Sequence, residues 1–422
     1  MMPKFNKSMR CYFVFYFAIA QVVYSQSSDY PLCNQDYNFI CYNKNEFVFS
    51  QKSHYLNRFY SKFDSLISQG KGTINIVHIG ASHVQADQMT GRLRENLYNL
   101  LPDLISSRGL LFPYAAAKSN HPYNYYSTLT GNWNSCRNVE SKKSCTLGIA
   151  GISASTTDTL AGFTFFFKRN IYPEFRFNEI TVLHATGECF YDIELLVDDS
   201  VKCFKTTYDG CTVFETDVLI DTLNFKVFKT DSMQDAFELY GVIAGKSNTN
   251  GIVYNAIGVN GASVQSFLRC FLFKEDMALL KPDLVILSLG INDVQDKNFS
   301  VDNFEKNYDL LINNIKRVNP NVSIIITTNS DSYYKRKYPN KNSELAVDAI
   351  YRLIEKHENT VLWDWFNIMG GLGAVKKWEK NKLAKKDLVH FTKEGYFLIG
   401  DLFYSAFIKA YENYLSQTTD GR

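Results

Sequence analysis

Three residues of types that support nucleophilic catalysis lie near two predicted turns. Ser82 follows the apolar run 74–79 in a Gly-Ala-Ser turn, and Asp387 and His390 stand three residues apart near the end of the chain. A catalytic serine needs a base that accepts its proton and a carboxylate that orients the base. His390 and Asp387 could supply both groups, with the carboxylate at the Nδ1 side of the ring and Nε2 facing Ser82.

Two further turns contain groups that could stabilise the negative charge of a tetrahedral intermediate. Gly261 and Asn292 each follow an apolar predicted strand. The backbone N–H groups of Ser82 and Gly261 and the side-chain amide of Asn292 are donors of the kind that form an oxyanion hole. Gly258 is a second-ranked alternative to Gly261.

Several neighbouring polar residues have both a functional and a structural interpretation. Gln85 and Asp87 could position a substrate, although Asp87 could equally compensate the helix dipole in a first turn. His83 could be considered as a base, but a structural hydrogen bond is favoured because adjacent residues point in different directions. Asp293 could simply cap the helix that follows it. The other histidines show no ligand spacing, so the sequence predicts no metal site and no cofactor.

The elements that must hold these residues together alternate between two types. Continuous apolar runs alternate with amphipathic helical segments, which is typical of a parallel sheet covered on both faces. Ligands of such sheets bind at the carboxyl ends of the strands, where Ser82, Gly261 and Asn292 are predicted to lie. Residues 47–69 are predicted to form one amphipathic helix. The predicted loop 107–126, which is rich in Tyr, Asn and Pro, could line a substrate site or simply cover the core.

The middle of the chain has a different pattern. Between 128 and 247, short runs rich in Phe, Thr, Val and Tyr alternate with polar turns, and helical periodicity is missing. This pattern predicts an antiparallel β-sandwich inserted into the surrounding α/β domain.

Four short blocks along the chain resemble those of a known superfamily. They are Gly-Ala-Ser at 80–82, Gly261, Gly-Ile-Asn-Asp at 290–293 and Asp-Leu-Val-His at 387–390. In this order they resemble the SGNH or GDSL superfamily of serine esterases. The resemblance implies a flavodoxin-like, three-layer α/β/α domain with Ser82 as nucleophile, His390 as base and Asp387 as its orienter. It also implies an oxyanion hole formed by Ser82, Gly261 and Asn292.

A narrower resemblance rests on the sequence His-Ile-Gly-Ala-Ser-His-Val-Gln-Ala-Asp at 78–87 and on the β-rich insertion. Both resemble the peptidoglycan O-acetylesterase branch, in which a carbohydrate-binding-like sandwich interrupts the SGNH domain, with related sequences typical of Bacteroidetes. Ala81 departs from the usual Gly-Asp-Ser block. Because that Asp is not a triad member in the family, the departure bears on turn geometry and activity level. It keeps open the alternative of a noncatalytic glycan-binding or envelope protein with the same fold.

The first residues and the composition indicate compartment and partners. Residues 1–25 have a basic flank, a short apolar run and small residues at the end, which predicts a secretory signal peptide and export to the periplasm, cell surface or medium. No membrane span is expected after its removal. The chain of 422 residues has 45 basic and 43 acidic residues, so nothing in its charge indicates a nucleic-acid partner. The predicted domains are 26–127 and 248–422 for the two parts of the SGNH domain and 128–247 for the insertion.

Cysteine usage agrees with export. Eight cysteines remain after the predicted cleavage, and an even count in an exported chain favours disulfides. Three pairs are close in sequence and are predicted to bond: Cys33 with Cys41, Cys136 with Cys145, and Cys203 with Cys211. Cys189 and Cys270 are left without a predicted partner.

These observations predict an exported serine esterase that removes O-acetyl groups from a glycan, with acetylated peptidoglycan as the expected substrate. A glycan O-acetyltransferase that uses the same residues is the first alternative. A lipase is less favoured because the chain lacks a long apolar lid.

Overall fold

The fold is described from a computed structural model, which covers residues 37–50, 56–100, 104, 106–168 and 175–419. The predicted signal peptide at 1–25 lies outside the described residues. None of the described helices is both long enough and apolar enough to cross a membrane.

A six-stranded sheet forms the centre of the α/β domain. Its strand order is β1-β19-β16-β15-β2-β14, and all neighbours are parallel except β1, which pairs antiparallel with β19 at the edge. The strands are β1 (Phe47–Phe49), β2 (Thr73–Gly80), β14 (Gly251–Gly258), β15 (Leu284–Ser288), β16 (Ser323–Thr327) and β19 (Thr360–Trp363). Numbered along the chain, the five parallel strands have the order 2-1-3-4-5, which is the flavodoxin-like arrangement. The predicted fold class of the α/β domain is confirmed.

Helices cover both faces of this sheet, because its strands are apolar on both sides. Ile74 and Ile76 of β2 belong to one core cluster with α2 (Asn57–Gln69), α4 (Met89–Asn99) and α12 (Lys393–Thr419). Val77 and Ile79 of the same strand belong to a second cluster with α6 (Phe273–Leu280), α8 (Val301–Val318) and α9 (Asn342–Lys356). The alternation along β2 thus divides the core into two layers.

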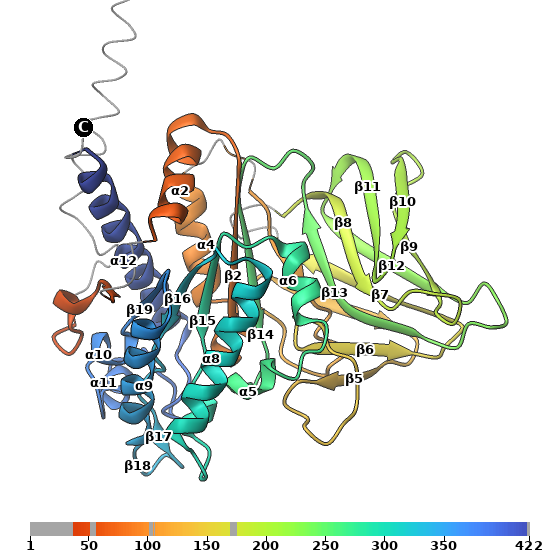
Figure 1. Cartoon of the computed structure of the whole chain (residues 1–422). Helices are drawn as coiled ribbons and strands as arrows, with labels where there is room; N and C mark the ends of the chain where they lie inside the picture. Colours follow the sequence, from red (N-terminus) through yellow and green to blue (C-terminus); the bar gives the residue numbers. More distant parts are fainter. Residues whose placement is uncertain (1–36, 51–55, 101–103, 105, 169–174, 420–422) are drawn as a thin grey trace, which may run out of the picture.

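Two antiparallel sheets lie beside the α/β domain (Figure 1). The larger has the order β10-β11-β8-β13-β6-β5, with β3 also paired to β13, and the smaller has the order β4-β7-β12-β9. Their strands are β3 (Gly109–Leu111), β4 (Tyr125–Thr130), β5 (Asn134–Arg137), β6 (Ile152–Thr156), β7 (Leu160–Phe167), β8 (Phe177–His184), β9 (Asp192–Leu196), β10 (Cys203–Tyr208), β11 (Cys211–Ile220), β12 (Thr222–Phe228) and β13 (Phe237–Gly245). The inserted β domain is therefore present. Its bounds at 128 and 247 remain a prediction. Strand β3 lies before residue 128 in the sequence, yet it pairs with β13 of the larger sheet.

Short elements complete the chain, most of them at the ends of the parallel strands. They are η1 (Tyr42–Lys44), α3 (Ser82–Gln85), α5 (Val264–Phe267), α7 (Ile291–Val294), β17 (Tyr333–Tyr334), β18 (Tyr338–Pro339), α10 (Trp365–Ile368) and α11 (Val375–Lys380). The single helix predicted over 47–69 is wrong in its first part: 47–49 pair with β19, and the helix begins at Asn57.

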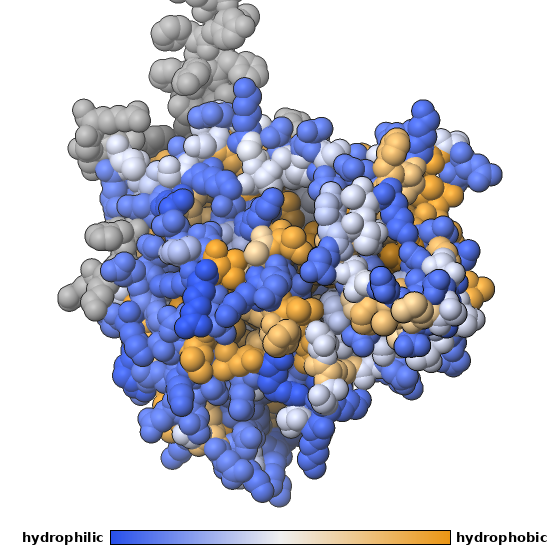
Figure 2. All heavy atoms as spheres, turned by 45° about the vertical axis from the view of Figure 1, so that its right-hand side comes forward, coloured by the Kyte–Doolittle hydropathy of each residue, from blue (hydrophilic) through white to orange (hydrophobic). Residues whose placement is uncertain are grey.

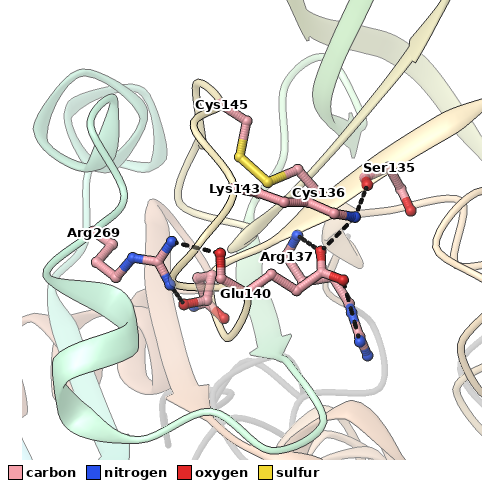
Figure 3. The surroundings of a disulfide bond; sticks show 8 residues. Ser135, Cys136, Arg137, Glu140, Lys143, Cys145 and Arg269 are labelled. Atoms are coloured by element: carbon pink, nitrogen blue, oxygen red, sulfur yellow. Dashed lines mark hydrogen bonds and ion pairs between the residues drawn. A yellow bond between two sulfur atoms is a disulfide. The ribbon is translucent and has the colours of Figure 1, made fainter.

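One of the predicted disulfides is confirmed. Cys136 and Cys145 are bonded, and the loop between them is held by Arg269, whose guanidinium donates to the carbonyls of Asn138 and Glu140 (Figure 3).

The Cys203–Cys211 pairing is wrong. The two residues lie at opposite ends of the β10–β11 hairpin, because Cys203 is opposite Thr216 and Cys211 is opposite Tyr208. Cys189 and Cys270 carry free thiols. The Cys33–Cys41 pairing involves Cys33, which lies outside the described residues.

Candidate active site

Ser82 begins a short helix directly after the central strand. β2 ends at Gly80, where a Cβ atom would lie 2.3 Å from Val84 Cγ2 and 2.9 Å from the Ser288 carbonyl oxygen, so a side chain does not fit at this turn. The buried Ala81 accepts hydrogen bonds at its carbonyl from the N–H groups of Val84 and Gln85. The strand, tight turn and helix thus form with alanine in place of the usual aspartate.

The loop before α12 brings a histidine and a carboxylate to this serine. Ser82 Oγ lies 3.1 Å from His390 Nε2, and His390 Nδ1 lies 3.0 Å from Asp387 Oδ2. The other oxygen, Asp387 Oδ1, accepts the N–H groups of Val389 and His390 at 3.0 and 2.9 Å. The structure therefore brings the three residues together in the order that a serine nucleophile, its base and an orienting carboxylate require.

The hydrogen bonds around Asp387 favour its charged form. Partial burial acts to raise the pKa of this carboxyl, but the N–H groups of His390 and Val389 and the His390 ring outweigh burial and hold the pKa below its ordinary value. An ionised Asp387 fixes the proton of a neutral imidazole at Nδ1, which leaves Nε2 as the acceptor toward Ser82.

The predicted oxyanion donors lie along the same cavity as the Ser82 hydroxyl. Ser82, Gly261 and Asn292 all line one cavity with His390. Neither the Ser82 N–H nor the Gly261 N–H has an acceptor among the described residues. Asn292 Nδ2 donates to the Ala262 carbonyl at 2.8 Å, which fixes the amide and leaves its second N–H free to donate.

Gly261 and Gly258 differ in their position relative to the cavity. Gly261 has a φ of +85° and lies in the lining. Gly258 instead packs against α3, where a Cβ atom would come within 2.1 Å of the Gln85 N atom. The ranking of Gly261 above Gly258 as a donor agrees with this placement.

Asp293 connects the two turns that carry these donors. Its carboxyl accepts the Val264 N–H at 3.2 Å, so it bonds the start of α5 and does not cap the helix that follows it. Burial raises the pKa of Asp293 to about 7, although the hydrogen bond from Val264 lowers it. The turn after β14 and the turn after β15 are thereby held together.

Gln85 and Asp87 have different surroundings. Gln85 lines the cavity, but its side chain is bonded within the protein: Nε2 donates to Ser119 Oγ and to the Asn120 carbonyl, and Oε1 accepts the Asn260 N–H. It connects α3, the loop before β4 and the turn after β14.

Asp87 is fully buried and does not line the cavity. It forms ion pairs with Arg94 and Arg108 and accepts a hydrogen bond from Asn124. The two arginines lower the pKa of Asp87 although burial acts to raise it. The interpretation of Asp87 as a substrate-binding residue does not fit this environment, because its oxygens are already used by the protein.

His83 packs against the loop of His390 and against α12. Its Nδ1 lies 3.1 Å from the Tyr396 hydroxyl, and its ring stacks on His390 with centroids 5.5 Å apart. Burial, together with the neighbouring His390, lowers the pKa of His83 to about 3, so this ring is neutral. The structural interpretation of His83 agrees with the contact.

The cavity at Ser82 has a volume of about 680 Å³ and is lined mostly by residues with polar side chains. The loop before β4 contributes Asn120, His121 and Tyr123, as one interpretation of the 107–126 segment predicted, and Lys385 contributes a cation. Lys385 belongs to the basic run 376–386, which the sequence leaves open as a solvated face or a contact for an anionic glycan, whereas sequence reasoning missed Tyr396, because nothing in its spacing distinguishes it from a core residue. The lining residues include no carboxylate. Among the described residues, no cluster of His, Cys, Asp and Glu could hold a metal ion.

Comparisons with known proteins agree with this arrangement. Residues 239–398 match the model of the GDSL-like Lipase/Acylhydrolase family, a range that includes Gly261, Asn292, Asp387 and His390. No curated protein matches the chain.

A solved structure of a peptidoglycan O-acetylesterase shares the fold over most of both chains. It is 20% identical, with a TM-score of 0.69, and the match covers 84% of this chain and 96% of that one. A lipase/acylhydrolase from Enterococcus faecalis is 22% identical, with 36% and 74% coverage and a TM-score of 0.30. A carbohydrate esterase family 3 protein from Talaromyces cellulolyticus is 19% identical, with 40% and 76% coverage and a TM-score of 0.31. Residues 239–398 thus match the GDSL-like lipases and acylhydrolases, and the likeness to the peptidoglycan O-acetylesterase structure shows that the fold is shared over most of the chain.

Proposed function

We propose that this protein is an exported serine esterase that removes O-acetyl groups from a glycan, with peptidoglycan as its substrate. The observation that carries the proposal is the relay from Ser82 Oγ through His390 to Asp387, at 3.1 and 3.0 Å, beside a polar cavity. Export rests on the signal-like sequence at 1–25.

The geometry supports a two-step acyl transfer. Ser82 Oγ attacks the acetyl carbonyl carbon while His390 Nε2 accepts its proton, and the oxyanion accepts hydrogen bonds from Ser82, Gly261 and Asn292. The imidazolium then gives the proton to the departing sugar oxygen, which leaves an acetyl group on Ser82. Water attacks this ester with His390 again as base, which releases acetate and restores the serine.

The lining of the cavity supports a short acyl group on a polar alcohol. Asn120, His121, Asn260 and Lys385 offer hydrogen bonds that suit sugar hydroxyls, and a long fatty acyl chain would find few apolar partners among the lining residues. The structure that shares the fold over most of both chains is a peptidoglycan O-acetylesterase. At 20% identity this likeness shows the fold alone, so the substrate is a proposal.

The test is acetate release from O-acetylated peptidoglycan by the oxidised full-length protein. We expect release by the wild type and none above background by Ser82→Ala, while Ser65→Ala, a change at a half-buried position of α2, should retain full activity. Equal release by wild type and Ser82→Ala would overturn the proposal. Adding a soluble oligosaccharide acceptor separates hydrolysis from transfer, because a transferase would place the acetyl group on the acceptor in place of releasing acetate.

A further inference from the structure

A short hairpin near Ser82's edge of the sheet is rich in aromatic and basic residues. We call residues 333–341, which contain β17 and β18, the tyrosine hairpin. Their sequence is Tyr-Tyr-Lys-Arg-Lys-Tyr-Pro-Asn-Lys, with no acidic residue. The segment follows β16, so it lies at the carboxyl edge of the sheet, the edge that also carries Ser82. In Figure 1 it lies at the lower end of the α/β domain, as does α5, and Figure 2 shows this end as mostly hydrophilic.

Two tyrosines of the hairpin form an aromatic surface. Tyr334 and Tyr338 are opposite each other in the strand register, which puts their side chains on the same face. Their ring centroids are 5.8 Å apart with an angle of 31° between the planes, and Tyr338 is 54% exposed. Both rings line a cavity of about 580 Å³, together with Asn340 and Asn342. Exposed aromatic faces flanked by amide groups suit the apolar faces and hydroxyls of sugar rings.

Positive charge is found both in the lining of this cavity and on the hairpin that carries its two tyrosines. Lys335, Arg336 and Lys337 extend from the hairpin, and Lys297 and Lys341 line the cavity. None of these five side chains forms an ion pair with another described residue. Lys335 Nζ lies 5.4 Å from the Tyr334 ring centroid, so the charge is held beside the aromatic surface. Asp296 is the one carboxylate in the lining, so the local excess is positive and attracts anions.

The hairpin is fixed to the elements that carry the active site. The Tyr333 N–H donates to the carbonyl of Leu388, which lies between Asp387 and His390, at 3.1 Å. Gln295, directly after α7, donates from Nε2 to Ser332 Oγ at 2.9 Å. A chain bound on the tyrosine hairpin would therefore lie next to the loop of His390 and the helix of Asn292.

We propose that the tyrosine hairpin and its cavity bind a saccharide chain that carries carboxylates, as a subsite beside the ester-cleaving centre. The tyrosines pack against sugar rings, and the lysine and arginine side chains pair with the carboxylates. The choice of a glycan as ligand rests on the proposed function, but the binding itself requires no turnover.

The test uses full-length Ser82→Ala protein and isothermal titration calorimetry, so that catalysis does not interfere. The probes are a galacturonate oligosaccharide and the same oligosaccharide after reduction of its carboxylates to alcohols. We expect the acidic probe to bind roughly tenfold tighter than the neutral one at low salt. Adding Lys335→Gln, Arg336→Gln and Lys337→Gln should remove this difference, and adding Tyr338→Ala should weaken the binding of both probes.

A matched control changes the same net charge elsewhere. Lys142→Gln, Lys274→Gln and Lys306→Gln replace exposed lysines on other elements and should preserve the preference for the acidic probe. Equal affinity for the two probes, absence of binding, or an equal loss in the control triple would overturn the proposal. Unchanged binding in Tyr338→Ala would overturn it as well. Acetate release by the protein with Ser82 intact is measured separately, so the failure of this subsite is distinguishable from the failure of the esterase.

Discussion

For a single polar residue, the hydrogen bonds that it already makes within the protein decide which of its donors and acceptors remain for a ligand. Asn292 uses one amide N–H on the Ala262 carbonyl and keeps the other for a ligand, whereas Gln85 uses both its amide nitrogen and its oxygen within the fold. Two amides that line the same cavity thus differ: Asn292 keeps an N–H that is free to donate, and Gln85 holds together the segments around the cavity.

The role of Asn292 predicts a specific kinetic loss. Asn292→Ala should lower kcat for acetyl ester hydrolysis by roughly 10²–10³-fold, because an oxyanion donor acts mainly in the transition state. KM should change little. Steady-state kinetics on 4-nitrophenyl acetate measure both parameters, with Asn313→Ala on α8 as the control. A loss below about threefold would exclude Asn292 as an oxyanion donor.

The raised pKa of Asp293 predicts how stability depends on pH. Its pKa is about 7 in the folded protein against an ordinary value of 3.8. As pH rises from about 4 to about 7, the unfolded chain loses this proton before the folded one does, so this group lowers the free energy of unfolding. Asp293→Asn removes the titration and still offers an acceptor to Val264. Urea unfolding should be measured at pH about 4 and about 7. Between these two values the free energy of unfolding should decrease less in Asp293→Asn than in the wild type, by up to about 4 kcal/mol.

The control for Asp293 is Asp302→Asn on the exposed first turn of α8, which should keep the wild-type decrease. An equal decrease in the free energy of unfolding for Asp293→Asn and wild type would contradict the prediction. Asp293 would then have the same pKa in the folded and the unfolded protein.

Sequence reasoning singled out Ser82, His390 and Asp387, which the structure brings within hydrogen-bond distance of one another. It did not predict the ion pairs and the cysteine contacts that form between residues elsewhere in the fold. Ser82 directly follows an apolar strand, and Asp387 and His390 share one short loop. Both features are local, so they can be read from the sequence without knowing the fold. Neither interpretation of Asp87, substrate positioning or helix-dipole compensation, includes its ion pair with Arg108, because Arg108 is 21 positions away and only the folded chain brings the two together. The Cys203–Cys211 pairing failed for a related reason: nearness in sequence put the two thiols at opposite ends of one hairpin.

At the scale of elements, a buried ion cluster fastens the helices after Ser82 to the chain that leads into the β domain. Asp87 lies just after α3, Arg94 is on α4, and Arg108 directly precedes β3. All three side chains are buried, so each guanidinium depends on this carboxylate.

Removing the carboxylate should therefore destabilise the protein strongly. Asp87→Ala leaves two buried cations without their anion and should cost about 3–5 kcal/mol of unfolding free energy. Glu305→Ala removes the partner of the exposed Arg352 and should cost less than about 1 kcal/mol. Chemical denaturation of both variants tests the difference, and similar losses would contradict the assigned role of the cluster.

Apolar periodicity predicted the elements well where strands are buried on both faces, as in β15 and β16. It failed at 47–69, where the aromatic residues of β1 fit a helical spacing equally well. The edge position of β1 against β19 depends on a partner more than 300 residues away, which no local pattern contains.

At the scale of the whole molecule, the two domains share one apolar core. A single cluster of buried side chains includes Val77 and Ile79 of the central strand, Leu110 of β3 and Phe165 of the smaller antiparallel sheet. The disulfide loop adds a second connection, through Arg269. The β domain therefore packs as part of the fold and not as a tethered module.

A continuous core predicts cooperative unfolding. Differential scanning calorimetry of the oxidised protein should show one transition, because loss of either domain would expose apolar surface of the other. Cys136→Ser with Cys145→Ser should lower the transition temperature without splitting the transition. Two resolved transitions in the wild-type protein would contradict the shared core.

If Ser82 is a nucleophile activated by His390, a serine-directed fluorophosphonate should react with it, and peptide mapping identifies the labelled residue. We expect one covalent adduct, on Ser82, in the folded wild-type protein. Labelling should be strongly reduced in His390→Ala and absent at this position in Ser82→Ala. An unlabelled Ser82 in folded wild type, or equal labelling with and without His390, would show that His390 does not activate Ser82.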